Sequence, residues 1–117
     1  MPTIHDLVRA IAQREGVEAV VILGRDGLLI DGRTTGDADV EHLAALTPVV
    51  VSAAEAIGQA SGGGSLITAV LEYDRGMAVV SCISADALMI VLAHESANMG
   101  MLLYDLRRHR ASIASLV

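Results

Sequence analysis

Histidine and cysteine are the residue types of this 117-residue chain most able to bind a metal or act as a nucleophile. The four histidines are His5, His42, His94 and His109, and no two of them have the four-residue spacing of a helical metal pair. Cys82 is the lone cysteine, which excludes a disulfide framework and a zinc site built on cysteines. We therefore expect no metal in this protein.

Two short segments have residue types found in catalytic or phosphate-binding sites. His94-Glu95-Ser96 could relay a proton, but consecutive residues at a strand-to-helix junction point in different directions, and Ser96 is better explained as a helix N-cap. Gly62-Gly63-Gly64 could cradle a phosphate only between a strand and a following helix. Here a predicted helix precedes the glycines, so they are expected to end it. We predict no catalytic residue, no cofactor and no enzymatic activity.

Composition excludes several classes of function. All 8 basic residues are Arg, so no lysine is present for a P-loop or a Schiff base. A net charge of −6, with 2 Tyr as the only aromatic residues, argues against nucleic-acid binding. The longest apolar stretch, 43–60, carries Pro48, Glu55 and Gln59, so we expect no membrane span. Residues 1–6 lack the pattern of a signal peptide, and we expect a cytoplasmic protein.

The periodicity of apolar residues predicts one domain over residues 1–117, with the element order α-β-β-α-β-β-β-α. Thr3 and Asp6 have the spacing of a capping box for the first helix, and Asp37 or Asp39 can cap the long middle helix. The expected strands are 17–23, 28–30, 66–73, 77–84 and 87–94, the expected loop is 31–39, and the middle and last helices cover 38–60 and the segment from Ser96 onward.

The strands predict how the layers stack. Apolar runs such as 20–23 and 88–93 are continuous, which is typical of strands covered on both faces. Most connections have hairpin length, so the five-stranded sheet is expected to be mainly antiparallel. We therefore predict a three-layer α/β/α sandwich, with the middle helix on one face and the two terminal helices on the other.

The middle helix is apolar around nearly its whole circumference. The arc expected to face the sheet contains Leu43, Leu46, Val50, Ala53, Ala54 and Ile57. Beside it lies a second arc of small or apolar residues, which one face of a single sheet cannot also bury. We therefore expect this helix to pack against a second helix from another copy or a relative. Pro48 predicts a bend or a local break near Ala44.

Several segments occur in an order and spacing that covers essentially the whole chain. They are Gly16-Val17-Glu18-Ala19-Val20-Val21-Ile22, Arg25-Asp26-Gly27-Leu28-Leu29-Ile30, the Ala-rich segment 43–58, Leu88-Met89-Ile90-Val91-Leu92-Ala93 and Asn98-Met99-Gly100. This pattern resembles the roadblock/dynein light-chain family, and more specifically its bacterial MglB-like members.

The resemblance implies a dimer and a partner. Family members pair through the middle helix and join their third strands, which places the interface at His42, Ala45, Val49, Ser52, Ala56, Ala60, Leu66, Thr68 and Val70. Their dimers act as platforms for Ras-like GTPases and can stimulate hydrolysis by rearranging the GTPase's own switch regions. If this chain binds such a GTPase, the expected contact surface is the more exposed side of the middle helix, with the 31–39 loop beside it; the helix residues are Glu41, Pro48, Glu55 and Gln59.

Two other functions remain open from the sequence. The chain could be a structural adaptor subunit, as a homodimer or half of a heterodimer, in a signalling or motility assembly. It could also be a small-molecule sensor with a pocket between sheet and helices, although few polar residues are available there to orient a ligand.

Overall fold

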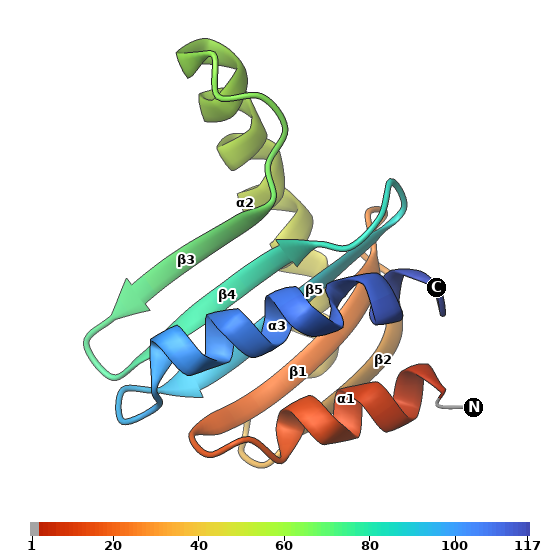
Figure 1. The fold of residues 1–117 in the computed structure, drawn as a ribbon, viewed down its shortest axis with the longest axis vertical. Helices are drawn as coiled ribbons and strands as arrows, with labels where there is room; N and C mark the ends of the chain where they lie inside the picture. The colour runs from red at the N-terminus through yellow and green to blue at the C-terminus, as the bar shows by residue number, and fades with distance from the viewer. Residues whose placement is uncertain (1–2) are drawn as a thin grey trace.

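The computed structural model describes residues 3–117, so Met1 and Pro2 of the segment tested for a signal peptide lie outside it. The element order is the predicted one (Figure 1). The helices are α1 (Ile4–Ala12), α2 (Val40–Ser61) and α3 (Met99–Ala114), and the strands are β1 (Val17–Gly24), β2 (Leu29–Thr34), β3 (Thr68–Tyr73), β4 (Gly76–Cys82) and β5 (Ala87–His94).

The five strands form one sheet in the order β2-β1-β5-β4-β3, and every neighbouring pair is antiparallel. The central strand β5 pairs Val91 with Val20 of β1 and with Val79 of β4. Strands β2 and β3 form the two edges. The predicted three-layer sandwich is confirmed, because α1 and α3 lie over one face of the sheet and α2 over the other (Figure 1).

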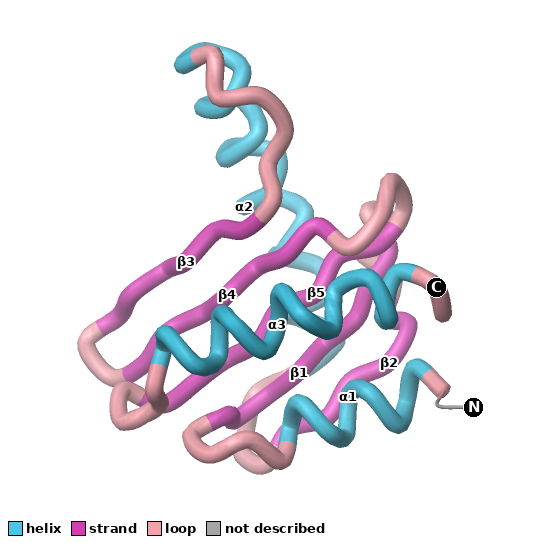
Figure 2. The backbone as a smooth tube through the Cα atoms, viewed as in Figure 1, coloured by secondary structure: helices cyan, strands magenta, loops and turns pink. Residues whose placement is uncertain are grey.

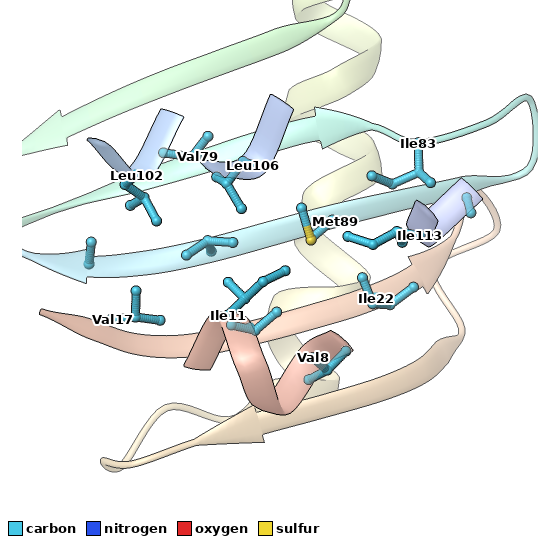
Figure 3. Close-up of a cluster of buried hydrophobic side chains, with 14 residues drawn as sticks. Val8, Ile11, Val17, Ile22, Val79, Ile83, Met89, Leu102, Leu106 and Ile113 are labelled. Atoms are coloured by element: carbon cyan, nitrogen blue, oxygen red, sulfur yellow. The ribbon is translucent and has the colours of Figure 1, made fainter. Parts of the chain in front are cut away.

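Each face of the sheet has its own apolar core. Beneath α1 and α3, the side chains of Val8, Ile11, Leu102, Leu106 and Ile113 pack on the sheet around Met89 (Figure 3). On the opposite face, α2 contributes Ala44 and Val51 to a cluster with Val21, Leu23, Val80, Leu88 and Ile90. The alternation of side chains along β1 sends Ile22 to the first core and Val21 to the second, which explains why these strands are apolar throughout.

The N-terminal caps of the three helices were predicted correctly in two cases. The Thr3 hydroxyl accepts from the Asp6 amide, and the Asp6 carboxylate accepts from the Thr3 amide, so the predicted capping box is present. Asp39 caps α2 by accepting from the Glu41 and His42 amides. The prediction for α3 is wrong: Asn98 is its N-cap and accepts from the Met101 amide, whereas Ser96 bonds to His94.

The predicted 31–39 loop begins too early, because β2 continues to Thr34. Its polar residues favour a loop locally, but Gly32 and Thr34 pair with Val21 and Ala19 of the buried strand β1. Tertiary pairing overrides the local composition here. In the same way β3 begins at Thr68 rather than at residue 66, and β4 ends at Cys82.

The local break predicted near Ala44 does not form, since α2 runs continuously from Val40 to Ser61, whereas a bend there stays a prediction. Proline has no amide hydrogen to donate to the Ala44 carbonyl one turn earlier. That carbonyl faces the β1–β2 turn, where a β-carbon on Gly27 would lie 3.6 Å from it. The helix therefore crosses Pro48 with one bond fewer, and the Thr47 hydroxyl donates to the Leu43 carbonyl at 2.7 Å beside it.

The predicted sheet-facing arc of α2 is also wrong. The buried residues of α2 are Ala44, Thr47 and Val51, about one residue position away around the helix. Leu46 is 48% exposed and Ile57 is 68% exposed. The reason is that only the N-terminal half of α2 lies on the sheet, whereas the second half extends beyond it (Figure 2). Small Ala44 lets the helix approach the sheet, and the larger leucines lie to its side.

Candidate interaction surface

The second half of α2 has few neighbours in its own chain. From Ser52 to Ser61 no residue is buried, and this part of the helix stands clear of the sheet (Figure 1). The helix packs mainly against β1, β2 and β5. An apolar helix segment that projects in this way lacks the cover that such helices normally have.

An apolar groove of about 310 Å³ opens between α2 and the half of the sheet that α2 leaves uncovered. Its walls on the helix are Leu43, Leu46 and Val50, three residues of the arc that was expected to be buried against the sheet. Its floor is formed by Leu71, Tyr73, Ala78, Ile90 and Leu92 of β3, β4 and β5. The groove is therefore the unfilled side of the second core.

Strand β3 borders this groove and forms an unpaired edge of the sheet. It pairs with β4 on one side and with no other strand in the described chain, 3–117. Val70 is 45% exposed and Tyr73 is 61% exposed. A free strand edge presents unpaired amide and carbonyl groups and invites another strand. The projecting helix, the groove and the free edge thus form one continuous surface.

The residues predicted for the dimer interface fall on or beside this surface. His42, Ala45, Val49, Ser52, Ala56 and Ala60 are all exposed on α2. Val70 is exposed on β3, and Leu66 and Thr68 are half-buried at its beginning. Because the structure contains one copy of the chain, the contact of these residues with a second copy stays a prediction.

The four residues predicted to contact a partner do not form one uniform patch. Glu41 and Gln59 are exposed, whereas Pro48 and Glu55 are half-buried. The Glu55 carboxylate accepts from the Arg25 guanidinium at 3.1 Å, which ties α2 to the β1–β2 turn. This pair, with Pro48, lines a cleft of about 250 Å³. Sequence reasoning missed the pair because the two residues are 30 positions apart.

Comparison with known proteins identifies the fold. Residues 3–93 match the Roadblock/LC7 domain. The chain belongs to the Roadblock/LC7 family. The resemblance inferred from the sequence is thereby confirmed.

Solved structures and other sequences agree with this assignment. A Roadblock/LC7 domain from Streptomyces avermitilis is 24% identical, with a TM-score of 0.88 over 97% of each chain. MglB from Myxococcus xanthus is 14% identical, also with a TM-score of 0.88, over 97% of this chain and 93% of that one. An uncharacterised protein of Methanocaldococcus jannaschii, MJ1340, is 24% identical over 102 residues, which are 87% of this chain and 89% of the relative.

This Roadblock/LC7 domain brings few reactive groups together. Among residues 3–117, no three histidine, cysteine or acidic side chains lie close enough to hold a metal ion. The His94 Nδ1 atom lies 2.8 Å from the Ser96 hydroxyl, so these two predicted relay residues do meet, in an exposed turn. Burial raises the pKa of the Cys82 thiol despite the nearby Arg25 guanidinium. Family members are generally non-enzymatic adaptors or regulators.

One property of α2 bears on the expected absence of a membrane span. By length and apolar composition alone it could cross a membrane, and it is the one helix in the described residues that could. One such helix is weak evidence for a membrane span, so the expectation of no membrane span stays a prediction. The same composition suits a helix of a protein core or interface, and Ala44, Thr47 and Val51 are buried against this sheet.

The sequence did not reveal the residues that line the groove. Leu71 and Tyr73 were assigned to a strand without a role, although Ala69, Leu71 and Tyr73 alternate onto one face of β3. That alternation is the one signal that could have located them. The helix wall could not be found, because an all-round apolar helix gives no periodic signal of which side faces the sheet.

Proposed function

We propose that this chain is a homodimeric, non-enzymatic regulator or scaffold for a Ras-like small GTPase in the cytoplasm. The observation that carries the proposal is the projecting, apolar second half of α2 beside an open apolar groove and a free β3 edge. Exposure of such an apolar surface to water is unfavourable for a single domain, whereas a second copy would cover it.

Dimerisation is supported by the way the features fit together. Two copies related by a two-fold axis would pair their β3 strands antiparallel and continue the sheet across the dimer. The same axis would bring the two α2 helices together, where Ala45, Ala56 and Ala60 permit close approach. The apolar groove on each copy would then be filled by the α2 helix of the other. A further MglB structure, similar to this chain with a TM-score of 0.86, has a tetrameric arrangement.

A GTPase partner is supported by the family and by its MglB neighbours, whose likeness suggests a regulatory role. In the proposed dimer, Glu41, Gln59 and the exposed residues 35–37 stay available to such a partner. Arg25 is engaged by Glu55 at 3.1 Å. As the family resemblance implies, regulation would act by rearranging the GTPase's own switch regions.

The first test is the mass of the particle in solution, measured by light scattering on a size-exclusion column. We expect about twice the 12.2 kDa of one chain. Particles of a single chain at high micromolar concentration would overturn the homodimer and, with it, the platform.

The second test concerns the GTPase. If a Ras-like GTPase is encoded beside this gene, it is the candidate to load either with a non-hydrolysable GTP analogue or with GDP and to apply with the dimer to the same column. We expect a complex that depends on the nucleotide. Binding that ignores the nucleotide would instead identify a structural adaptor, and no complex in either state would remove the GTPase from the proposal.

A further inference from the structure

Opposite charges lie at the two ends of the free edge strand β3. At its beginning, a cleft of about 550 Å³ is lined by the end of α2, the 63–68 segment and two arginines of α3, Arg107 and Arg110. At its end, Glu72 of β3 and Asp74 of the β3–β4 turn line a second hollow of about 700 Å³, with Arg75 beside them. The basic end and the acidic end belong to the same strand.

Among residues 3–117, none of these acidic or basic groups forms an ion pair. In the part of the protein that the structure describes, the ion pairs of arginine are Arg14 with Asp105 and Arg25 with Glu55. The Arg110 Nε atom donates to the Cys82 carbonyl at 2.8 Å, which fixes this side chain at the end of β4, and within residues 3–117 its terminal NH₂ groups have no hydrogen-bond partner. In a chain with 14 acidic and 8 basic residues, two unpaired arginines in one cleft call for a carboxylate from outside.

The acidic and the basic groups lie on the same face of the sheet. Thr68, Val70 and Glu72 alternate onto one face of β3, and Val70 lies opposite Val79, which belongs to the core beneath α3. Arg107 and Arg110 come from α3 on that face, and Thr68 lines their cleft. A carboxylate set opposite Thr68 on a neighbouring strand would therefore lie beside the two guanidinium groups.

Two-fold pairing of β3 supplies such a carboxylate. Both α2 helices lie on the same side of the joined sheet only if two directly opposing residues point to the same face of their own chains. Because side chains alternate along a strand, the numbers of two such residues must add up to an even number. If the two-fold axis passes near the middle of the strand Thr68–Tyr73, the numbers of opposing residues add up to 140 or 142. The first places Glu72 of a second copy opposite Thr68, and the second places Asp74 there. Either register brings an acidic residue to the arginine cleft.

We infer that Arg107 and Arg110 of one copy form ion pairs with Glu72 and Asp74 of a second copy, and that these pairs set the register of the β3 strands. The inference rests on the homodimer proposed above and adds the residues that select its partner and alignment. Because the axis is two-fold, each contact is made twice. A shift of two residues to either side of these registers would leave fewer of these charges paired, so the charges discriminate among alignments that β3 backbone bonding alone would accept.

Charge reversal tests the inference. Arg107→Glu places like charges at both symmetric contacts, and we expect it to raise the dimer dissociation constant about tenfold or more, measured by sedimentation equilibrium at low salt. The matched control is Arg108→Glu, which makes the same charge change one residue away. Arg108 stacks over Tyr104, 5.7 Å from the ring centroid, and does not line the cleft. We expect its dissociation constant to stay within about twofold of the original.

A charge swap gives a positive result that loss of folding cannot imitate. The double variant Glu72→Arg/Asp74→Arg should also weaken its own homodimer. Mixed with the double variant Arg107→Glu/Arg110→Glu, it should form a heterodimer preferentially, because both contacts then join opposite charges, and native mass spectrometry would count the species.

The possible failures can be told apart. The charge pairing would be overturned, and the homodimer would stand, in either of two cases. In the first, the unmodified protein is a dimer but Arg107→Glu changes the dissociation constant no more than Arg108→Glu does. In the second, the two charge-reversed chains form a statistical mixture of dimers. An original protein that is monomeric would overturn both the homodimer and this inference.

Discussion

Gly16 connects α1 to β1 where the chain entering α3 passes close by. Its φ of +85° lies in the left-handed region, and a β-carbon there would lie 2.6 Å from the Ala97 β-carbon. Gly62, at the end of α2, has a φ of +73° but open space around the same position. We expect Gly16→Ala to lower the free energy of unfolding by about 2–5 kcal/mol, through backbone strain and overpacking together.

Gly62→Ala is the comparison that separates the two effects. It keeps the backbone strain but has no close contact like that with Ala97, so we expect its free energy of unfolding to fall by about 1–2 kcal/mol. Urea unfolding of both variants at one protein concentration measures the difference. Equal losses for the two variants would mean that the contact with Ala97 contributes nothing.

Cys82 is the one thiol of the chain, and its side chain lies in the core beneath α2. Burial raises its pKa, so less thiolate is present at neutral pH than in a free cysteine. We expect a disulfide reagent at pH 8 to label the folded protein at least about a hundredfold more slowly than the urea-unfolded protein. As a control, Ala85→Cys in a Cys82→Ser background presents an exposed thiol in the β4–β5 turn and should react rapidly.

The same shift of pKa predicts how stability depends on alkaline pH. The folded-state pKa of Cys82 lies above the unfolded one, so its contribution to stability is fully present below the unfolded pKa. That contribution is lost as the pH rises through the folded pKa. Cys82→Ala should therefore show a shallower decline of unfolding free energy at alkaline pH than the original chain, and parallel curves would contradict this account.

Single residues with local partners were the most predictable from sequence. The capping pair Thr3 and Asp6 lie three positions apart, and their hydrogen bonds to each other follow from that spacing. Ser96 was assigned wrongly because Asn98, two positions later, is an equally good N-cap by type. Sequence alone cannot choose between two good caps when the exit of β5 decides where α3 begins.

Among the elements, α2 is the one whose sequence and structure disagree most. Its existence, its Asp39 cap and its end at Gly62 were predictable, because caps and glycines act locally. Its orientation was not, since Leu43, Ala44, Leu46 and Val51 are all apolar candidates for the side that faces the sheet. The close packing of Ala44 decided the orientation, and packing of that kind has no signature in one chain's periodicity.

Pro48 gives a test of how α2 tolerates a missing hydrogen bond. Pro48→Ala restores an amide that can donate to the Ala44 carbonyl, so we expect the free energy of unfolding to rise by about 1–2 kcal/mol. The gain is below the full cost of a helical proline, because proline also restricts the unfolded chain. Thermal unfolding at fixed protein concentration measures it. A loss of stability would show instead that the packing of Pro48 near Gly27 outweighs the missing bond.

Across the whole molecule, the sequence predicted an excess of apolar surface but not its location. The composition and the all-round apolar α2 indicated that one chain could not cover itself. The groove became visible only in the fold, because Leu43 and Val50 of α2 meet Leu71 and Tyr73 of β3 across about twenty residues of sequence or more. The surface forms where α2 leaves the sheet, which depends on how all three layers pack.

The location of that surface predicts which exposed apolar residue matters for assembly. Val49 is 67% exposed on α2, on the surface proposed to pair, and Met101 is 55% exposed on α3, on the opposite layer. A charge at the centre of a dimer interface would be buried without a partner, so Val49→Glu should raise the dimer dissociation constant about a hundredfold. Met101→Glu should leave it unchanged, because that side chain stays in water. Both variants should keep the circular dichroism spectrum of the original, since neither side chain belongs to a core. Equal effects of the two substitutions in sedimentation equilibrium would place the contact between copies somewhere other than α2.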